Sequence, residues 1–231
     1  MKRIAISLVV LLGLLLVADR AAAAFAAQAV AAQAQAAAGL RSEPDVDVGG
    51  FPFLTQALAG RYTRVEVRAD VVTAGEITLN RLEATLDGAQ VPLSDALSGS
   101  VEQVPVDGIR ARAVVGYDEL SRRSGDRQLV VSPAGGQLRV TGSVQVLGRE
   151  VSATALSDVE VVEGDLVVSA QSFEVGHEAV DELLTRALRG RLDLRIPVTG
   201  LPYGLQVTGV EVQAEGLVFL ASSGPTVLRG R

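Results

Sequence analysis

Few residues in this chain carry the chemistry that enzyme active sites use. The sequence contains no cysteine, and His177 is its single histidine, so a thiolate nucleophile is excluded and a typical zinc site nearly so. A histidine-dependent triad would have to use His177, which lies where a helix is expected to begin, and no Gly-x-Ser-x-Gly elbow accompanies it. No glycine-rich phosphate loop is present either. We therefore expect a protein that is not an enzyme and that uses no cofactor or metal.

Carboxylate pairs leave one enzymatic alternative open. The chain has 27 acidic residues, and two facing carboxylates are the equipment of a glycosidase. Most of these residues alternate with apolar ones along expected strands, which places them on a solvated face. Asp45-x-Asp47 contains two of the oxygen ligands that calcium prefers, but no glycine turn or twelfth-position glutamate follows. A solvated linker is the better interpretation of that pair.

The net charge limits which partners the protein can bind, and the N-terminal residues indicate the compartment in which it works. The formal net charge of −6 argues against nucleic acid and against simple electrostatic adhesion to anionic lipid. Lys2 and Arg3 precede fifteen uncharged residues, 4–18, which is the layout of a secretory signal. Fifteen helical residues span roughly 22 Å, short of the ~30 Å hydrocarbon core, so a cleaved signal and a short membrane anchor both remain open. In either case the bulk of the chain leaves the cytoplasm.

Two amphipathic helices and many half-apolar strands are expected beyond the linker. Pro52 fits the first position of a short helix in which Phe53, Leu54, Ala57 and Leu58 share one face, and Gly60 ends it. The period then changes to two in the strand that carries Val65, Val67, Ala69 and Val71. A second helix is expected over residues 177–189, with an apolar face formed by Val180, Leu183, Leu184, Ala187 and Leu188.

The strand pattern predicts an α+β fold in which a long, curved antiparallel sheet is wrapped around amphipathic helices. Eight to ten strands are each apolar on one side only, and slips of the alternation near Arg81 and Gly209 indicate bulges that bend the sheet. Such a sheet could enclose a packed core or an aliphatic ligand, and periodicity alone favours the packed core. We divide the chain into a signal or anchor (1–20), an alanine-rich helix with a polar linker (21–47) and one domain (48–231), whose residues 225–231 should fray.

The order of these segments resembles the LmeA-type phospholipid-binding family of actinobacterial cell envelopes. The resemblance rests on four places: Ala18-Asp19-Arg20 with its alanine-rich continuation; Gly50-Phe-Pro-Phe-Leu-Thr-Gln-Ala-Leu-Ala-Gly-Arg61 with the Val65-x-Val67 strand; the helix 179–188 leading into Ile196-Pro197-Val198; and Gly200-Leu-Pro-Tyr-Gly-Leu205 with the closing strand 210–218. The second place is the most specific. The resemblance implies a fold similar to tubular lipid-binding domains, a phospholipid ligand, and a location on the extracytoplasmic face of the cytoplasmic membrane or in the cell envelope.

The resemblance also implies candidate binding residues, each of which has a plainer structural interpretation. Acyl-chain contacts would come from the apolar faces of the two helices, and phosphate-headgroup contacts from the arginines that follow each helix, because arginine offers bidentate donors. Taken singly, the apolar residues would more often be core, and the arginines would more often be solvated helix ends. The acyl set is Phe51, Phe53, Leu54, Leu58, Leu183, Leu184 and Leu188, and the headgroup set is Arg61, Arg64, Arg186, Arg189 and Arg191.

Three functions from different classes follow. The leading one is a phospholipid-binding or lipid-shuttling protein that holds acyl chains in an apolar slot between sheet and helices. The second is an envelope scaffold with a dry core that acts through its outer surface. The third, more distant, is a glycan-active enzyme with paired carboxylates. The sequence gives no headgroup specificity and no oligomeric state.

Overall fold

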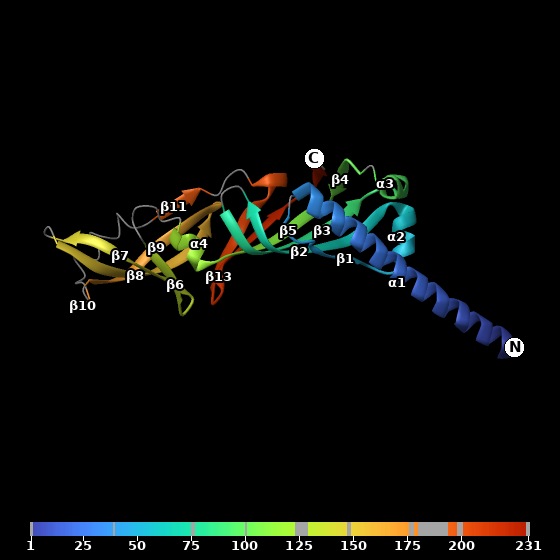
Figure 1. The fold of residues 1–231 in the computed structure, drawn as a ribbon, viewed down its shortest axis with the longest axis horizontal. Helices are drawn as coiled ribbons and strands as arrows, with labels where there is room; N and C mark the ends of the chain where they lie inside the picture. Colours follow the sequence, from blue (N-terminus) through green and yellow to red (C-terminus); the bar gives the residue numbers. More distant parts are fainter. Residues whose placement is uncertain are drawn as a thin grey trace. The chain divides into compact units, whose positions relative to one another are not determined.

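A computed structural model describes residues 2–38, 40–74, 77–99, 101–122, 129–146, 149–175, 178–179, 194–197 and 201–229. It contains helices and antiparallel sheets (Figure 1), which confirms the expected α+β class. The helices are α1 (Lys2–Ala38), α2 (Phe53–Ala59), α3 (Leu93–Ser98) and α4 (Tyr117–Arg122), with a 3₁₀ turn, η2, at Pro202–Gly204. The strands are β1 (Asp45–Gly49), β2 (Arg61–Ala74), β3 (Ile77–Gln90), β4 (Gln103–Val106), β5 (Gly108–Val115), β6 (Val130–Ala134), β7 (Gln137–Val146), β8 (Arg149–Val162), β9 (Asp165–Val175), β10 (Glu178–Ala179), β11 (Leu194–Pro197), β12 (Gln206–Gln213), β13 (Gly216–Ser223) and β14 (Thr226–Arg229).

The chain forms two compact units. Unit 1 comprises Met1–Asp70, Glu83–Arg110 and Ser223–Arg231, and unit 2 comprises Val71–Leu82 and Ala111–Ser222. One sheet has the strand order β1-β2-β3-β5-β13-β12, and a second has the order β10-β9-β8-β7-β6 with β11 beside β9. Strands β2, β3, β5 and β13 contribute residues to both units.

Unit 1 is built from strand pairs whose apolar residues point to one side. In the antiparallel β1–β2 pair, Val46 is opposite Val67 and Val48 is opposite Val65. Val65 and Ala69 are buried, which confirms that part of the predicted strand, whereas Val71, expected on the same apolar face, is 46% exposed. The alanine-rich half of α1 packs on β1 and buries Ala31, so this segment belongs to the unit. The core also contains Val46, Val48, Phe53, Ala57, Val65, Ala69, Ala89, Val106 and Ile109.

The end of the chain corrects one expectation. Residues 225–231 were expected to fray, but Thr226–Arg229 form β14, which pairs antiparallel with β4 in a separate two-stranded sheet. Val227 lies opposite Pro105 and Leu228 opposite Val104. Four residues carry too short a pattern to predict a strand, and their partner lies far earlier in the chain. The pairing is therefore a tertiary feature that local sequence does not report.

Unit 2 contains the hairpins that the turn residues predicted. The strands β8 and β9 are joined at Glu163 and Gly164, and β6 and β7 at Gly135 and Gly136. A register shift in the β12–β13 pair between Val207 and Gly209 confirms the predicted bulge at Gly209. The buried residues of this unit include Val114, Val115, Leu138, Leu166, Ala170, Phe173, Val207, Leu217 and Val218.

The second expected helix begins differently from its prediction. Glu178 and Ala179, at its start, form strand β10 and pair with Val175 and Glu174 of β9. A helix at this place therefore cannot begin at residue 177. Residues 180–193, which carry its apolar face, lie outside the described residues.

Candidate functional site

Helix α2 has two apolar faces in place of the single face that its spacing predicted. Phe53 and Ala57 are buried, and the Phe53 ring lies 6.0 Å from the Tyr62 ring of β2. Leu54 and Leu58 are 38% and 77% exposed. Because the side chains at i and i+4 stack along one line of a helix, the buried line and the exposed line lie side by side. Burial raises the pKa of the Tyr62 hydroxyl above its usual 10.0, in keeping with a ring that is packed against the core.

The start of α2 is held by a residue of α1. Pro52 stands just before the helix in an extended conformation, with ψ 141°, so it precedes the helix and does not occupy its first position. The Leu54 N–H donates to the Asp19 carboxylate at 2.8 Å, and Asp19 is 3% exposed. An aspartate oxygen on the free N–H groups of a helix start is the usual capping interaction. Here the cap comes from 35 positions earlier in the sequence, so spacing rules could not find it.

Arg20 joins the same cluster. Its guanidinium donates to the Asp19 carboxylate at 2.6 Å and to the Gly50 carbonyl at 3.2 Å. It also lies 5.4 Å from the centre of the Phe51 ring, within the range of a cation–π interaction. Phe51 itself is 66% exposed. The sequence signal for this cluster was the charged pair Asp19-Arg20 after an uncharged segment, which the sequence analysis used as the end of that segment and as part of the family resemblance, without assigning it a contact with α2.

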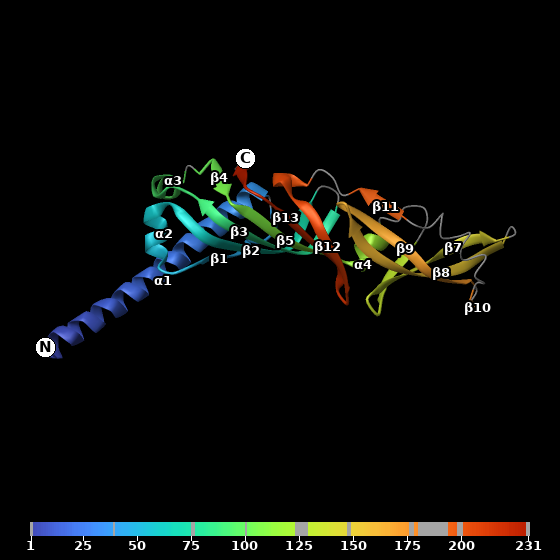
Figure 2. The same ribbon diagram turned by 180° about the vertical axis from the view of Figure 1, so that it is seen from behind.

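The end of α2 is fixed by backbone contacts to the next helix. Gly60 has φ 64°, a left-handed conformation that suits glycine, and its N–H donates to the Ala57 carbonyl at 3.2 Å. The Gly60 carbonyl accepts from the Val91 N–H at 2.9 Å, which leads directly into α3. In Figures 1 and 2, α2 and α3 lie together at the end of unit 1 from which the N-terminal half of α1 projects. Leu97 of α3 is 80% exposed.

The candidate headgroup arginines that can be placed are exposed and paired with acids. Arg61 makes an ion pair with Asp107, and Arg64 lies 4.0 Å from Glu66. Exposed pairs of this kind contribute only about 0–1 kcal/mol, so either arginine can exchange its acid for another anion at small cost. Arg186, Arg189 and Arg191 lie outside the described residues, as do Leu183, Leu184 and Leu188.

A groove of about 460 Å³ lies between α1 and the segment that contains β1. It is lined by alanines of α1, among them Ala27 and Ala31, and by residues 43–48, which include Glu43, Asp45 and Asp47. Its size is within the usual range of ligand sites. The excess of carboxylates disfavours an anionic group there, so we do not place a phosphate headgroup in it. No group of three or more metal-ligating side chains occurs among the residues that the structure describes.

Many apolar side chains along the strands are only half-buried. Among the described residues, Val218 is the one large side chain less than 2% exposed. Leu82 and Leu86 of β3, and Leu156 and Val159 of β8, are of intermediate exposure. The described strands therefore present apolar surface in addition to the packed core.

The sequence was compared with models of protein families and with curated proteins. The model of one protein family, described as LmeA-like phospholipid-binding, matches residues 17–222. No curated protein matches the chain. The matched region begins shortly before Asp19 and ends before β14, so it includes the cap of α2, the alanine-rich half of α1 and nearly all of the two larger sheets.

Proposed function

Because the chain belongs to the LmeA-like phospholipid-binding family, we propose that it binds phospholipids outside the cytoplasm and carries them within the cell envelope. The family match over residues 17–222 is the observation that carries the proposal. Among the described residues, α1 is the one helix long and apolar enough to cross a membrane, over Lys2–Ala36, and signal sequences share that property. The charge distribution at its start supports export of the remainder.

We propose that the acyl chains lie against the apolar strand faces. The half-buried leucines and valines of the strands support this placement, because they offer apolar surface that the packed core does not use. The acyl contacts proposed in the second helix are Leu183, Leu184 and Leu188. Those proposed in unit 1 are Phe51, Phe53, Leu54 and Leu58, of which Phe53 is also part of the core.

The proposed headgroup contacts are Arg61 and Arg64, which follow α2, or Arg186, Arg189 and Arg191, which follow the second helix. Their guanidinium groups suit a phosphate. We propose no catalytic step, since holding a lipid requires only apolar contact and charge complementarity. The competing function is an envelope scaffold with a dry core.

Photo-crosslinking with the full chain tests the slot. The chain is reconstituted in phosphatidylcholine vesicles containing a phospholipid with a diazirine on its acyl chain, and crosslinked peptides are mapped by mass spectrometry. We expect crosslinks in residues 129–222 as well as in α1. Leu184→Asp should abolish those in 129–222, and Val130→Asp, which changes an exposed side chain of β6, should keep them. Crosslinks confined to α1 would favour the dry-core scaffold.

A further inference from the structure

Unit 1 exposes large apolar side chains on α2, on α3 and just before α2. They are Phe51, Leu54, Leu58 and Leu97, which we call the α2–α3 patch, and all four side chains are between 38% and 80% exposed. Residues 48–60 contain no charged side chain. The helices α2 and α3 are neighbours, and large exposed apolar side chains that gather on one surface mark an interaction site.

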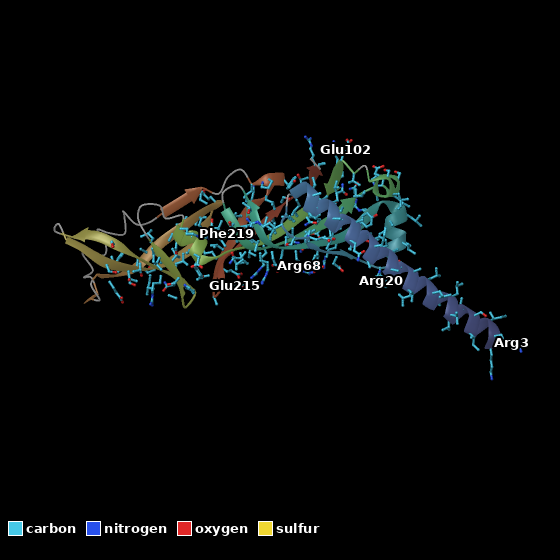
Figure 3. The ribbon with its side chains drawn as sticks, in the orientation of Figure 1. Arg3, Arg20, Arg68, Glu102, Glu215 and Phe219 are labelled. Atoms are coloured by element: carbon cyan, nitrogen blue, oxygen red, sulfur yellow. The ribbon has the colours of Figure 1, made fainter. Side chains whose placement is uncertain are left out.

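The patch is connected directly to the uncharged segment of α1. The segment ends at residue 18, and the next two residues bind the patch: Asp19 accepts from the Leu54 N–H, and Arg20 lies over the Phe51 ring. Two residues of helix correspond to about 3 Å along its axis. Figure 3 shows Arg3 at the far end of the projecting half of α1 and Arg20 where α1 meets unit 1. Between them, residues 4–18 are exposed and carry no charge.

The length of the segment draws the patch toward the lipid. Fifteen residues of helix span roughly 22 Å, about 8 Å less than the hydrocarbon core. A short span is accommodated by thinning the bilayer and by pulling its flanking residues inward. Asp19 and Arg20 neutralise each other at 2.6 Å, which makes that movement less costly than for an isolated charge. The exposed patch side chains that Asp19 and Arg20 hold then reach the same depth in the bilayer as this ion pair.

From these contacts we propose that α1 is retained as a membrane anchor and that the α2–α3 patch inserts into the outer leaflet beside it. The occupant of the patch is lipid, because the covalent and hydrogen-bonded link to the spanning segment places lipid next to it. Asp19 is a positioning residue: its carboxylate fixes the angle between the anchor and α2. This proposal goes beyond the bound phospholipid of the preceding section and does not require the acyl slot.

The absence of cysteine permits a direct test with single labels in the full chain. Leu58→Cys and, as the control, Val130→Cys are labelled with an environment-sensitive nitrobenzoxadiazole and reconstituted in phosphatidylcholine vesicles that contain a spin-labelled phospholipid quencher. We expect the probe at position 58 to shift to the blue and lose most of its fluorescence to the lipid quencher. The probe at position 130 should behave as in water. Both side chains are exposed in the protein alone, so the comparison isolates contact with lipid.

The role of Asp19 is tested in the same system. Asp19→Ala should weaken lipid quenching of the probe at position 58 but not of a probe at position 9 in the anchor. Asp19→Asn should keep the quenching at position 58, because the amide oxygen of asparagine also accepts from the Leu54 N–H. A water-like probe at position 58 would overturn the proposal. So would a mature protein whose measured mass lacks residues 1–19, or shielding of position 58 that appears only at high protein-to-lipid ratio, which would indicate a second copy. None of these outcomes changes the crosslinking expected in residues 129–222. The acyl slot and the inserted patch are therefore tested independently of each other.

Discussion

Phe51 and Phe53 offer a matched pair for testing how α2 is held. The two residues have the same side chain and lie two positions apart, but Phe53 is 4% exposed and Phe51 is 66% exposed. Phe53→Ala removes a ring from the core of unit 1, beside Tyr62. Phe51→Ala removes an exposed ring that lies against the Arg20 guanidinium. The structure therefore predicts different results for the same chemical change.

The expected magnitudes follow from burial. Truncating a core phenylalanine to alanine costs about 3–5 kcal/mol, since apolar contacts are lost and a cavity is left. Losing an exposed cation–π contact costs about 0.5–1 kcal/mol. For a cooperative domain of this size each kcal/mol lowers Tm by roughly 2–4 °C, so Phe53→Ala should lower Tm by roughly 6–20 °C. Phe51→Ala should lower it by no more than about 4 °C on the same scale.

The assay is urea and thermal unfolding of the full chain in mild detergent, followed by circular dichroism. Tyrosine emission provides a second probe, because the chain has no tryptophan and Tyr62 lies beside the mutated ring. Equal losses of stability for the two variants would refute the described packing of α2. A Phe53→Ala protein that kept its stability but lost its acyl crosslinks would show that Phe53 serves lipid binding alone and is not part of the core.

Three further predictions concern other parts of the molecule. Gly216→Ala should lower the free energy of unfolding by about 1–3 kcal/mol or more, because the new Cβ would lie 2.3 Å from the Val115 carbonyl oxygen. The control Gly224→Ala places its Cβ more than 4 Å from any neighbouring atom, so it should leave the urea midpoint unchanged. Burial raises the pKa of both Tyr62 and Tyr117 above 10.0, so their contribution to stability is complete below pH 10 and is lost as pH rises through the folded-state pKa. Tyr62→Phe should remove part of this loss of stability at alkaline pH. The measurement is the urea midpoint of unfolding as a function of pH. Lipid quenching of the position-58 probe should be insensitive to salt, because the patch residues that enter the lipid are uncharged; release by salt would instead indicate electrostatic adhesion.

Local features of the fold were predictable from local sequence. Gly60 after the last apolar residue ends α2, and Glu163-Gly164 turns β8 into β9. The bulge at Gly209 was visible as a slip of the alternation, because a period of two moves side chains to the other face when one residue is inserted. The bulge expected near Arg81 stays a prediction. In each confirmed case a few neighbouring residues determine the backbone conformation.

Features that depend on distant partners were not predictable. Asp19 caps a helix that begins far along the chain, and β14 forms only because β4 offers it an edge. The start of the second helix was wrong for a related reason: Glu178 and Ala179 join the edge of β9, so sheet pairing overrides their helical spacing. The same limit applies to the candidate site residues that the structure describes. Periodicity grouped Phe53 with Leu58 on one face, but it could not show that Phe53 faces the core and Leu58 the solvent.

The two faces of α2 connect folding to membrane contact. The buried line of Phe53 and Ala57, the Gln56 side chain, and the backbone of Gly60 together attach the helix to its unit. Leu58 adds little to that attachment, because a side chain that is 77% exposed gains only a fraction of the ~1.5–3 kcal/mol that full burial provides, whereas Leu54, 38% exposed, gains more of it. Transfer of the exposed fractions of the four patch residues into lipid would by the same scale gain roughly 4–8 kcal/mol. The exposed apolar line contributes less to folding than the buried one, and Asp19 holds it directly after the uncharged segment of α1. Contact with the bilayer accounts for it most simply.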